Sequence, residues 1–165
     1  MGKKAREILE KRGMKVDELI KKLNRAYADE WLAYIQYWTG AQVAEGLMRP
    51  NIEAEMMEHA NEELGHAKKV CDRIIELGGT PILDPKDYFK QTNCGYDVPK
   101  NFSTKALLKQ NIDAERCAIA VYNDIVEYAR KGGDTVTFHI ARSIMQDEME
   151  HEQDLEDLLT DITVK

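Results

Sequence analysis

Two sets of metal-binding residue types repeat along this chain at a constant offset of 85 residues. In each set, a glutamate is followed 33 residues later by a Glu-x-x-His motif. The two sets are Glu30, Glu63 and His66, and Glu115, Glu148 and His151. Four carboxylates and two imidazoles are what two adjacent metal ions require, so the duplication predicts a di-metal site, with iron as the expected metal.

Composition places the chain among helical proteins of one domain. Of its 165 residues, 43% are hydrophobic and 32% are charged, and only four are proline. This length supports one domain with a real core. No segment resembles a signal peptide and no apolar run reaches membrane-spanning length, so we expect a cytoplasmic protein with no membrane partner. The net charge of −7 disfavours a dedicated nucleic-acid binder.

Periodicity of 3.6 residues predicts four long helices. They run from about Val16 to Glu45, from about Ile52 to Leu77, from a Ser103 cap to Gly132-Gly133, and from an Asp134 cap to about Leu159. A short extra helix is expected to end near Gly13. Residues 80–103 are long enough to cross a whole bundle, whereas the other links make antiparallel hairpins. We therefore expect an all-α, up-down-down-up four-helix bundle, with residues 1–165 as one domain.

The six repeated residues are expected to face the core. Glu30 is the lone acid on an apolar and aromatic helix face, and Glu115 repeats this position. A core-facing carboxylate is costly unless it is paired or binds a metal. A bend could bring one such glutamate to solvent, but two at matched positions disfavour that explanation. In a Glu-x-x-His motif, both side chains lie over the same side of the helix.

Hard carboxylate oxygens with one imidazole per metal suit iron or manganese better than structural zinc. We expect Glu30 and Glu115 to be terminal ligands and Glu63 and Glu148 to bridge the ions. His66 and His151 would each bind one ion.

Other residues near the repeats are weaker candidates. Tyr37 and Tyr122 follow the first glutamate of each set by seven residues. They could orient carboxylates and supply an electron, or be ordinary core tyrosines. Glu62 and Asp147 could orient the histidines or be solvated acids. We expect His59 to be a hydrogen-bonded core histidine rather than an accessory ligand.

The segments EELGHA and DEMEHE, each 33 residues after its partner glutamate, resemble the ferritin-like superfamily, and bacterioferritin most in spacing. A haem-binding methionine would be expected where this chain has Leu64, so no haem is expected. Only 14 residues follow His151, too few for the fifth helix of a 24-subunit cage. Cys94 and Cys117 resemble the paired cysteines of the Dps-like thioferritins.

This resemblance implies a dodecameric homo-oligomeric cage that oxidises ferrous iron with hydrogen peroxide, or dioxygen, and stores the ferric product. Two iron ions per subunit are implied, with manganese or zinc possible in their place. Cys94 and Cys117 would form a redox-active or protected pair. Two independent free thiols are the alternative. We expect Cys71 to be a buried thiol rather than a metal ligand.

Two further functions stay open. One is a discrete di-metal peroxidase or catalase that turns over without storing iron. The other is a DNA-compacting protein, supported only by the basic residues 1–15, which include Lys3, Lys4 and Arg6. The acidic balance disfavours DNA binding, and a solvated first helix explains these charges.

Overall fold

The computed structural model describes residues 3–163, so the four outermost positions of the expected domain 1–165 lie outside the described residues. Within this range the chain is helical. Its elements are α1 (Lys3–Lys11), α2 (Val16–Val43), α3 (Arg49–Glu76), a 3-10 turn η1 (Pro85–Asp87), α4 (Tyr88–Gln91), α5 (Thr104–Gly132) and α6 (Thr135–Asp161). No helix among residues 3–163 is both long enough and apolar enough to cross a membrane.

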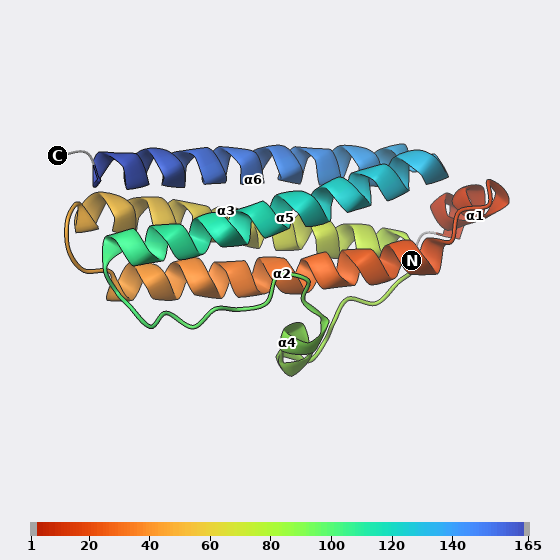
Figure 1. The fold of residues 1–165 in the computed structure, drawn as a ribbon. Coiled ribbons are helices and arrows are strands. Elements are labelled where there is room, and N and C mark those ends of the chain that lie inside the picture. Colours follow the sequence, from red (N-terminus) through yellow and green to blue (C-terminus); the bar gives the residue numbers. More distant parts are fainter. Residues whose placement is uncertain (1–2, 164–165) are drawn as a thin grey trace.

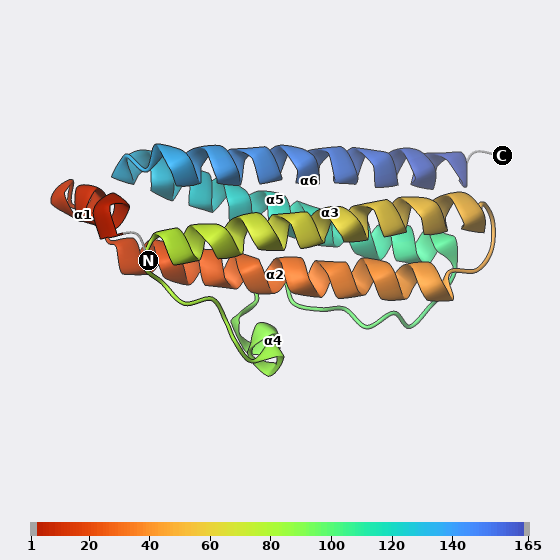
Figure 2. The ribbon, with the colours of Figure 1, turned by 180° about the vertical axis from the view of Figure 1, so that it is seen from behind.

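The four long helices form the expected up-down-down-up bundle. Helices α2 and α3 are one antiparallel hairpin, and α5 and α6 are the other (Figure 1). Helices α3 and α5 run in the same direction because the crossover between them spans the length of the bundle, as the view from behind also shows (Figure 2). This confirms the fold class expected from the sequence.

Helix ends follow local chemistry. The expected caps are confirmed, since Ser103 accepts a hydrogen bond from the Ala106 amide and Asp134 from the Thr137 amide. Helix α2 ends at Val43, two residues before the expected end. Helix α3 begins at Arg49, three residues before the expected start. Pro50 is compatible with the first turn, because backbone N–H groups there have no partner within the helix and proline lacks this group.

The crossover is partly ordered by helical turns and by contacts to α2. Both η1 and α4 lie within it, and α4 packs on α2. Near its end, the Glu45 amide donates to the Phe102 carbonyl and the Thr104 amide donates to the Glu45 carbonyl. This short parallel bridge ties the end of the crossover to the α2–α3 link.

The apolar core consists of two large clusters and a smaller one, in which Leu32 of α2 packs against Tyr88 of α4. One large cluster contains Leu23 and Val70, and the other contains Ala41 and Ile112. Along α2, Glu30 falls between the two large clusters, so a polar layer separates two apolar ones. Water is therefore excluded from above and below this layer.

The N-terminal segment packs onto one end of the bundle. Leu9 of α1 belongs to the core, while Arg6 pairs with Glu10 and Asp17 at 2.7 Å each. Lys4 pairs with Glu7 at 3.6 Å. These contacts fit a solvated helix that balances its own basic charges.

Candidate metal centre

The structure brings all six repeated residues together in the polar layer. Each of the four long helices contributes: a glutamate from α2 and from α5, and a Glu-x-x-His pair from α3 and from α6. All six side chains are buried, with residue exposures of 1–3%. They are Glu30, Glu63, His66, Glu115, Glu148 and His151.

Around His66, three carboxylates converge on the inner ring nitrogen. His66 Nδ1 lies 3.1 Å from Glu63 Oε2, 3.1 Å from Glu148 Oε1 and 3.7 Å from Glu30 Oε2. The donor atoms of these four residues lie within 4.8 Å of one another. This spacing suits one metal ion, because ligands held about 2.1 Å from a shared ion lie about 3.0–3.4 Å apart.

Around His151 the arrangement is repeated with the other half of the duplication. His151 Nδ1 lies 3.2 Å from Glu148 Oε2, 3.5 Å from Glu63 Oε1 and 3.9 Å from Glu115 Oε1. Glu63 and Glu148 thus occur in both groups, and each offers one oxygen to each side. A carboxylate that faces two sites with separate oxygens is placed to bridge two ions.

Several inward-facing atoms of this cluster have no hydrogen-bond partner. They are Glu63 Oε1, both carboxylate oxygens of Glu148, and His151 Nδ1. Buried polar atoms without partners are costly in a folded protein, so a cluster of them indicates a missing ligand. Electron-pair donors of this kind fit a pair of divalent metal ions.

The two tyrosines connect the halves of the duplication crosswise. The Tyr37 hydroxyl donates to Glu115, and the Tyr122 hydroxyl donates to Glu30. Both rings are fully buried. Each tyrosine therefore orients the terminal carboxylate of the other hairpin rather than the carboxylate of its own helix.

The outer nitrogens of the histidines are also held crosswise. His66 Nε2 lies 3.0 Å from Asp147 on α6, and His151 Nε2 lies 2.5 Å from Glu62 on α3. An acid at the outer nitrogen fixes the orientation of the ring and directs Nδ1 inward. Among the alternatives for Glu62 and Asp147, the geometry supports the orienting role.

Electrostatics in this cluster favour protons on several of the candidate ligands. Burial, together with the charge of neighbouring glutamates, raises the pKa of Glu30 and of Glu115 well above the ordinary value. Burial alone would lower the pKa of His151, but the carboxylates of Glu148 and Glu63, 3.2 and 3.5 Å from its Nδ1, outweigh burial and raise this pKa to about 12. The pKa of His66 is raised for the same reason.

Glu63 behaves in the opposite way. Burial by itself would raise its pKa, but the nearby rings of His151 and His66 outweigh burial and lower the pKa. Protonated histidines therefore favour the ionised form of this carboxylate. Metal ions that bind here must displace these protons.

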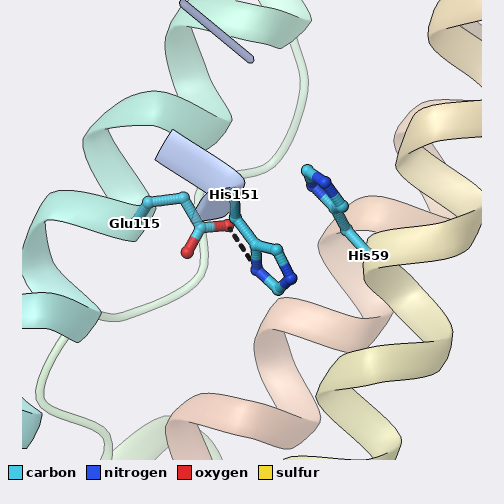
Figure 3. Close-up of side chains that lie close together, drawn as sticks. All are labelled: His59, Glu115 and His151. Atoms are coloured by element: carbon cyan, nitrogen blue, oxygen red, sulfur yellow. Dashed lines mark ion pairs between the residues drawn. The ribbon is translucent and has the colours of Figure 1, made fainter. Parts of the chain in front are cut away.

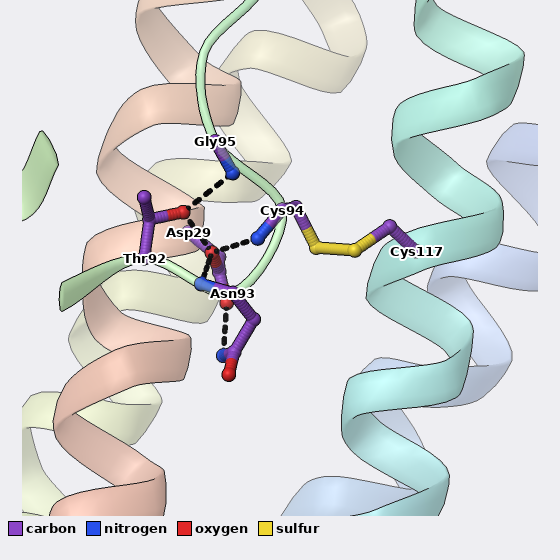
Figure 4. The surroundings of a disulfide bond; sticks show 6 residues. All are labelled: Asp29, Thr92, Asn93, Cys94, Gly95 and Cys117. Atoms are coloured by element: carbon purple, nitrogen blue, oxygen red, sulfur yellow. Dashed lines mark hydrogen bonds between the residues drawn. A yellow bond between two sulfur atoms is a disulfide. The ribbon is translucent and has the colours of Figure 1, made fainter. Parts of the chain in front are cut away.

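A narrow cavity leads from the crossover to this cluster. Its lining includes Glu30 and Glu115 at the bottom and Cys94 and Gly95 of the crossover at the top. Cys94 forms a disulfide with Cys117 of α5, as the resemblance to thioferritins implied (Figure 4). The disulfide fixes the crossover over the opening.

An acid next to Glu30 secures this same loop. The Asp29 carboxylate accepts hydrogen bonds from the Asn93 amide at 2.7 Å, from the Cys94 amide at 3.0 Å and from the Thr92 hydroxyl (Figure 4). We did not expect a role for Asp29 from the sequence. Its position directly before Glu30, on the neighbouring helix face, was the available signal.

His59 and Cys71 differ from expectation. His59 is buried as expected, but its Nδ1 has no hydrogen-bond partner. Its ring instead stacks on His151 with ring centroids 4.1 Å apart, and burial lowers its pKa to about 3. Cys71 is a free thiol that is only half-buried, and it belongs to none of the candidate metal groups found among residues 3–163.

Fold and site together define a four-helix bundle with a duplicated, buried carboxylate–histidine cluster. The model of the ferritin-like domain matches residues 20–164, and the chain therefore belongs to the ferritin-like family.

Similar proteins include a thioferritin, a DNA protection during starvation protein and a bacterioferritin. The structure of the bacterioferritin-related protein of Bacteroides fragilis, described as a dodecameric thioferritin, superimposes with a TM-score of 0.95 at 49% identity, over 98% of this chain and 95% of that chain. The DNA protection during starvation protein of Pyrococcus furiosus is 34% identical over 94% of this chain and 84% of its own length. A bacterioferritin of Rhodobacter capsulatus is 29% identical over 84% of this chain and 81% of its own length.

Proposed function

We propose that residues 1–165 form a single domain that acts as a ferroxidase subunit of an iron-storing homo-oligomeric cage. Two ferrous ions would be the substrate, held between the four helices of each subunit. Hydrogen peroxide would be the preferred oxidant, with dioxygen as the other candidate. The activity would remove both reactants of hydroxyl-radical chemistry and so protect against oxidative stress.

The observation that carries this proposal is the sharing of two glutamates. Glu63 and Glu148 each direct one oxygen toward His66 and the other toward His151. Two ions bridged by carboxylates lie close enough to act together on one oxidant molecule. Glu30 and Glu115 complete one ion's ligand set each.

The charge of the cluster suits this substrate. Four carboxylates carry four negative charges when ionised, which balance two divalent ions, while the neutral histidines supply electron pairs. Each ferrous ion gives one electron, so two ferrous ions, one hydrogen peroxide and two protons yield two ferric ions and two water molecules. Because both electrons are delivered together, no hydroxyl radical is released.

The chain's own groups can manage the protons of this reaction. Protons leave Glu30, Glu115 and the histidines as iron binds, since their pKa values are raised in the metal-free cluster. The two buried tyrosine hydroxyls hold the terminal carboxylates in place throughout.

The dodecameric state is proposed from the Bacteroides fragilis thioferritin, which is described as dodecameric and matches 98% of this chain. The Cys94–Cys117 disulfide is consistent with the term thioferritin, which is used for that protein. We propose that this pair is redox-active, because it lies over the cavity that leads to the cluster.

The decisive experiment deletes one bridge. Glu63→Ala and Glu148→Ala should each slow peroxide-dependent oxidation of ferrous iron by at least about 100-fold, measured by stopped-flow absorbance with the metal-free protein. Glu150→Ala, which removes an exposed acid from α6, the helix of Glu148, is the matched control and should leave the rate unchanged. Near-normal oxidation in both bridge variants would disprove the assignment.

A loading experiment separates a storage cage from a discrete di-metal peroxidase or catalase. Several hundred ferrous ions per assembly are added with peroxide, followed by size-exclusion chromatography and measurement of iron per subunit. Iron far above two per subunit, eluting with a large assembly, supports storage. Iron that stops at two per subunit on a small oligomer supports the discrete enzyme instead.

A further inference from the structure

A second cluster of metal-binding residue types lies beside the candidate centre. It comprises Glu55 and His59 of α3 and Asp154 of α6. One ligand atom from each lies within 4.8 Å of the others. Unlike the central cluster it reaches the surface, because the side chains of Glu55 and Asp154 are 31% and 54% exposed.

The buried member of this cluster has no satisfactory partner. His59 Nε2 lies 3.5 Å from Glu55 Oε1 and 4.0 Å from Asp154 Oδ2. Both distances exceed the 2.7–3.2 Å range of N–H···O hydrogen bonds. Nδ1 of the same ring is buried without any hydrogen-bond partner, although the residue is only 2% exposed. Nε2 is therefore the nitrogen that faces the two carboxylates without a close hydrogen bond, and Nδ1 is a second nitrogen of the same ring that lacks a partner.

The spacing in this cluster is similar to that in the candidate di-metal centre. In the candidate di-metal centre, the inner histidine nitrogens lie 3.1–3.9 Å from the carboxylate oxygens that would share an ion with them. Of the two distances around His59 Nε2, 3.5 Å lies within this range and 4.0 Å lies just above it. Among residues 3–163, no lysine or arginine forms an ion pair with Glu55 or Asp154, so a cation from solvent meets no competitor there.

The ring of His59 also belongs to a candidate group inside the bundle. Together with Glu115 and His151 it offers ligand atoms within 4.8 Å of one another. Figure 3 shows His59 on α3 beside His151, with Glu115 of α5 on the other side of His151. His59 is therefore shared by a surface cluster and the di-metal cluster.

We propose that Glu55, His59 and Asp154 bind a third divalent cation, and that His59 passes ferrous iron from this site to the di-metal centre. Exposed carboxylates would capture the ion, and the buried imidazole would hold it next to His151. Cation binding stands on the geometry of the cluster. The hand-over rests on the ferroxidase function proposed above.

The binding test uses Co²⁺ as the probe and the full-length, metal-free assembly. Equilibrium dialysis followed by metal analysis should give three Co²⁺ per subunit for the unmodified protein and two for Glu55→Gln/Asp154→Asn. The matched control Glu58→Gln/Asp157→Asn removes the same charge from exposed positions three residues along each helix and should keep three. Two Co²⁺ in the unmodified protein, or three in the Glu55→Gln/Asp154→Asn variant, would overturn the site.

A bridge-deficient variant keeps the two proposals distinguishable. Glu63→Ala/Glu148→Ala should retain one Co²⁺ per subunit, held by the surface cluster. If that variant still bound three, the di-metal assignment would fail while the third site stood.

The hand-over is tested by the rate of iron oxidation at limiting ferrous iron. Glu55→Gln/Asp154→Asn should oxidise iron at least fivefold more slowly below saturation and reach the normal rate at saturation, because its di-metal centre is intact. The control variant should match the unmodified protein at both concentrations. An unchanged rate at limiting iron would overturn the hand-over.

Discussion

At the scale of single residues, the candidate centre is built from contacts between the two copies of the duplication. Tyr37 holds Glu115, and Tyr122 holds Glu30. Glu62 and Asp147 likewise orient the histidine of the other copy. Each residue that positions a ligand therefore lies on a different helix hairpin from the ligand itself.

Removal of these hydroxyls should weaken iron binding without unfolding the bundle. Tyr37→Phe and Tyr122→Phe keep the buried ring but leave the terminal carboxylate without its donor. We expect each to lower the affinity for ferrous iron by about 10-fold or more. The measurement is anaerobic titration calorimetry. Tyr34→Phe is the control, because Tyr34 lies at the edge of the core; an equal loss there would contradict the specific role.

At the scale of elements, the crossover is attached to the bundle at separate points. Asp29 accepts hydrogen bonds from the middle of the crossover. The Cys94–Cys117 disulfide joins the crossover to α5, and the backbone bridge at Glu45 holds its C-terminal end. A segment of this length would otherwise be loosely held. Its position over the cavity thus depends on a few named contacts.

Loss of the disulfide should reduce stability by a predictable amount. Because the two cysteines are 23 residues apart, Cys117→Ser should lower the free energy of unfolding by about 3 kcal/mol under oxidising conditions. Urea unfolding of the metal-free protein measures this. With a reductant present, the variant and the unmodified protein should unfold alike. Cys71→Ser, which breaks no disulfide, should cost far less; an equal loss would argue against the disulfide.

The start of α6 depends on a buried ion pair. Asp134 caps the helix and accepts hydrogen bonds of 2.9 Å from Arg73, while the Arg73 Nε donates to Thr137. Asp134→Ala removes the cap and leaves the buried guanidinium of Arg73 with only the exposed Glu76 as a charged partner. We expect a loss of about 3–5 kcal/mol in chemical unfolding. Ser103→Ala, which removes a cap without a buried charge, should cost about 1 kcal/mol. Similar losses in both would contradict this reasoning.

At the scale of the whole molecule, the metal-free bundle should lose stability as the pH rises. The pKa of His151 is raised to about 12, so its contribution is fully present below about pH 6.5, the ordinary value, and is lost gradually toward pH 12. The raised pKa of Glu30 and Glu115 acts in the same direction above about pH 4.5.

Metal ions compete with these protons, so added metal should stabilise the protein more at high pH. We expect the increase in Tm caused by Co²⁺ to be larger at pH 8.5 than at pH 6, measured by calorimetry with and without metal. Glu63→Ala/Glu148→Ala should show little of this pH dependence. A metal-induced increase that shrank with rising pH would contradict the proton competition.

The sequence was sufficient to predict the topology, both helix caps and the convergence of six buried residues. Periodicity places a residue on a helix face, and the constant offset of 85 relates the two hairpins. It does not fix how the hairpins rotate against each other. For that reason the crosswise tyrosine bonds, the stacking of His59 on His151 and the binding of the crossover by Asp29 emerged only from the structure.

The crosswise construction has a consequence for biosynthesis. The first hairpin leaves the ribosome with Glu30, Glu63 and His66 but without Glu148, which lies on the last helix. An incomplete chain therefore presents at most three of the four donors grouped around His66 and no partner site. With the proposed ligand set, firm binding of metal would require α6 to have docked, so nascent and truncated chains would not accumulate redox-active ions. Occupancy of the centre would report that synthesis and folding are complete.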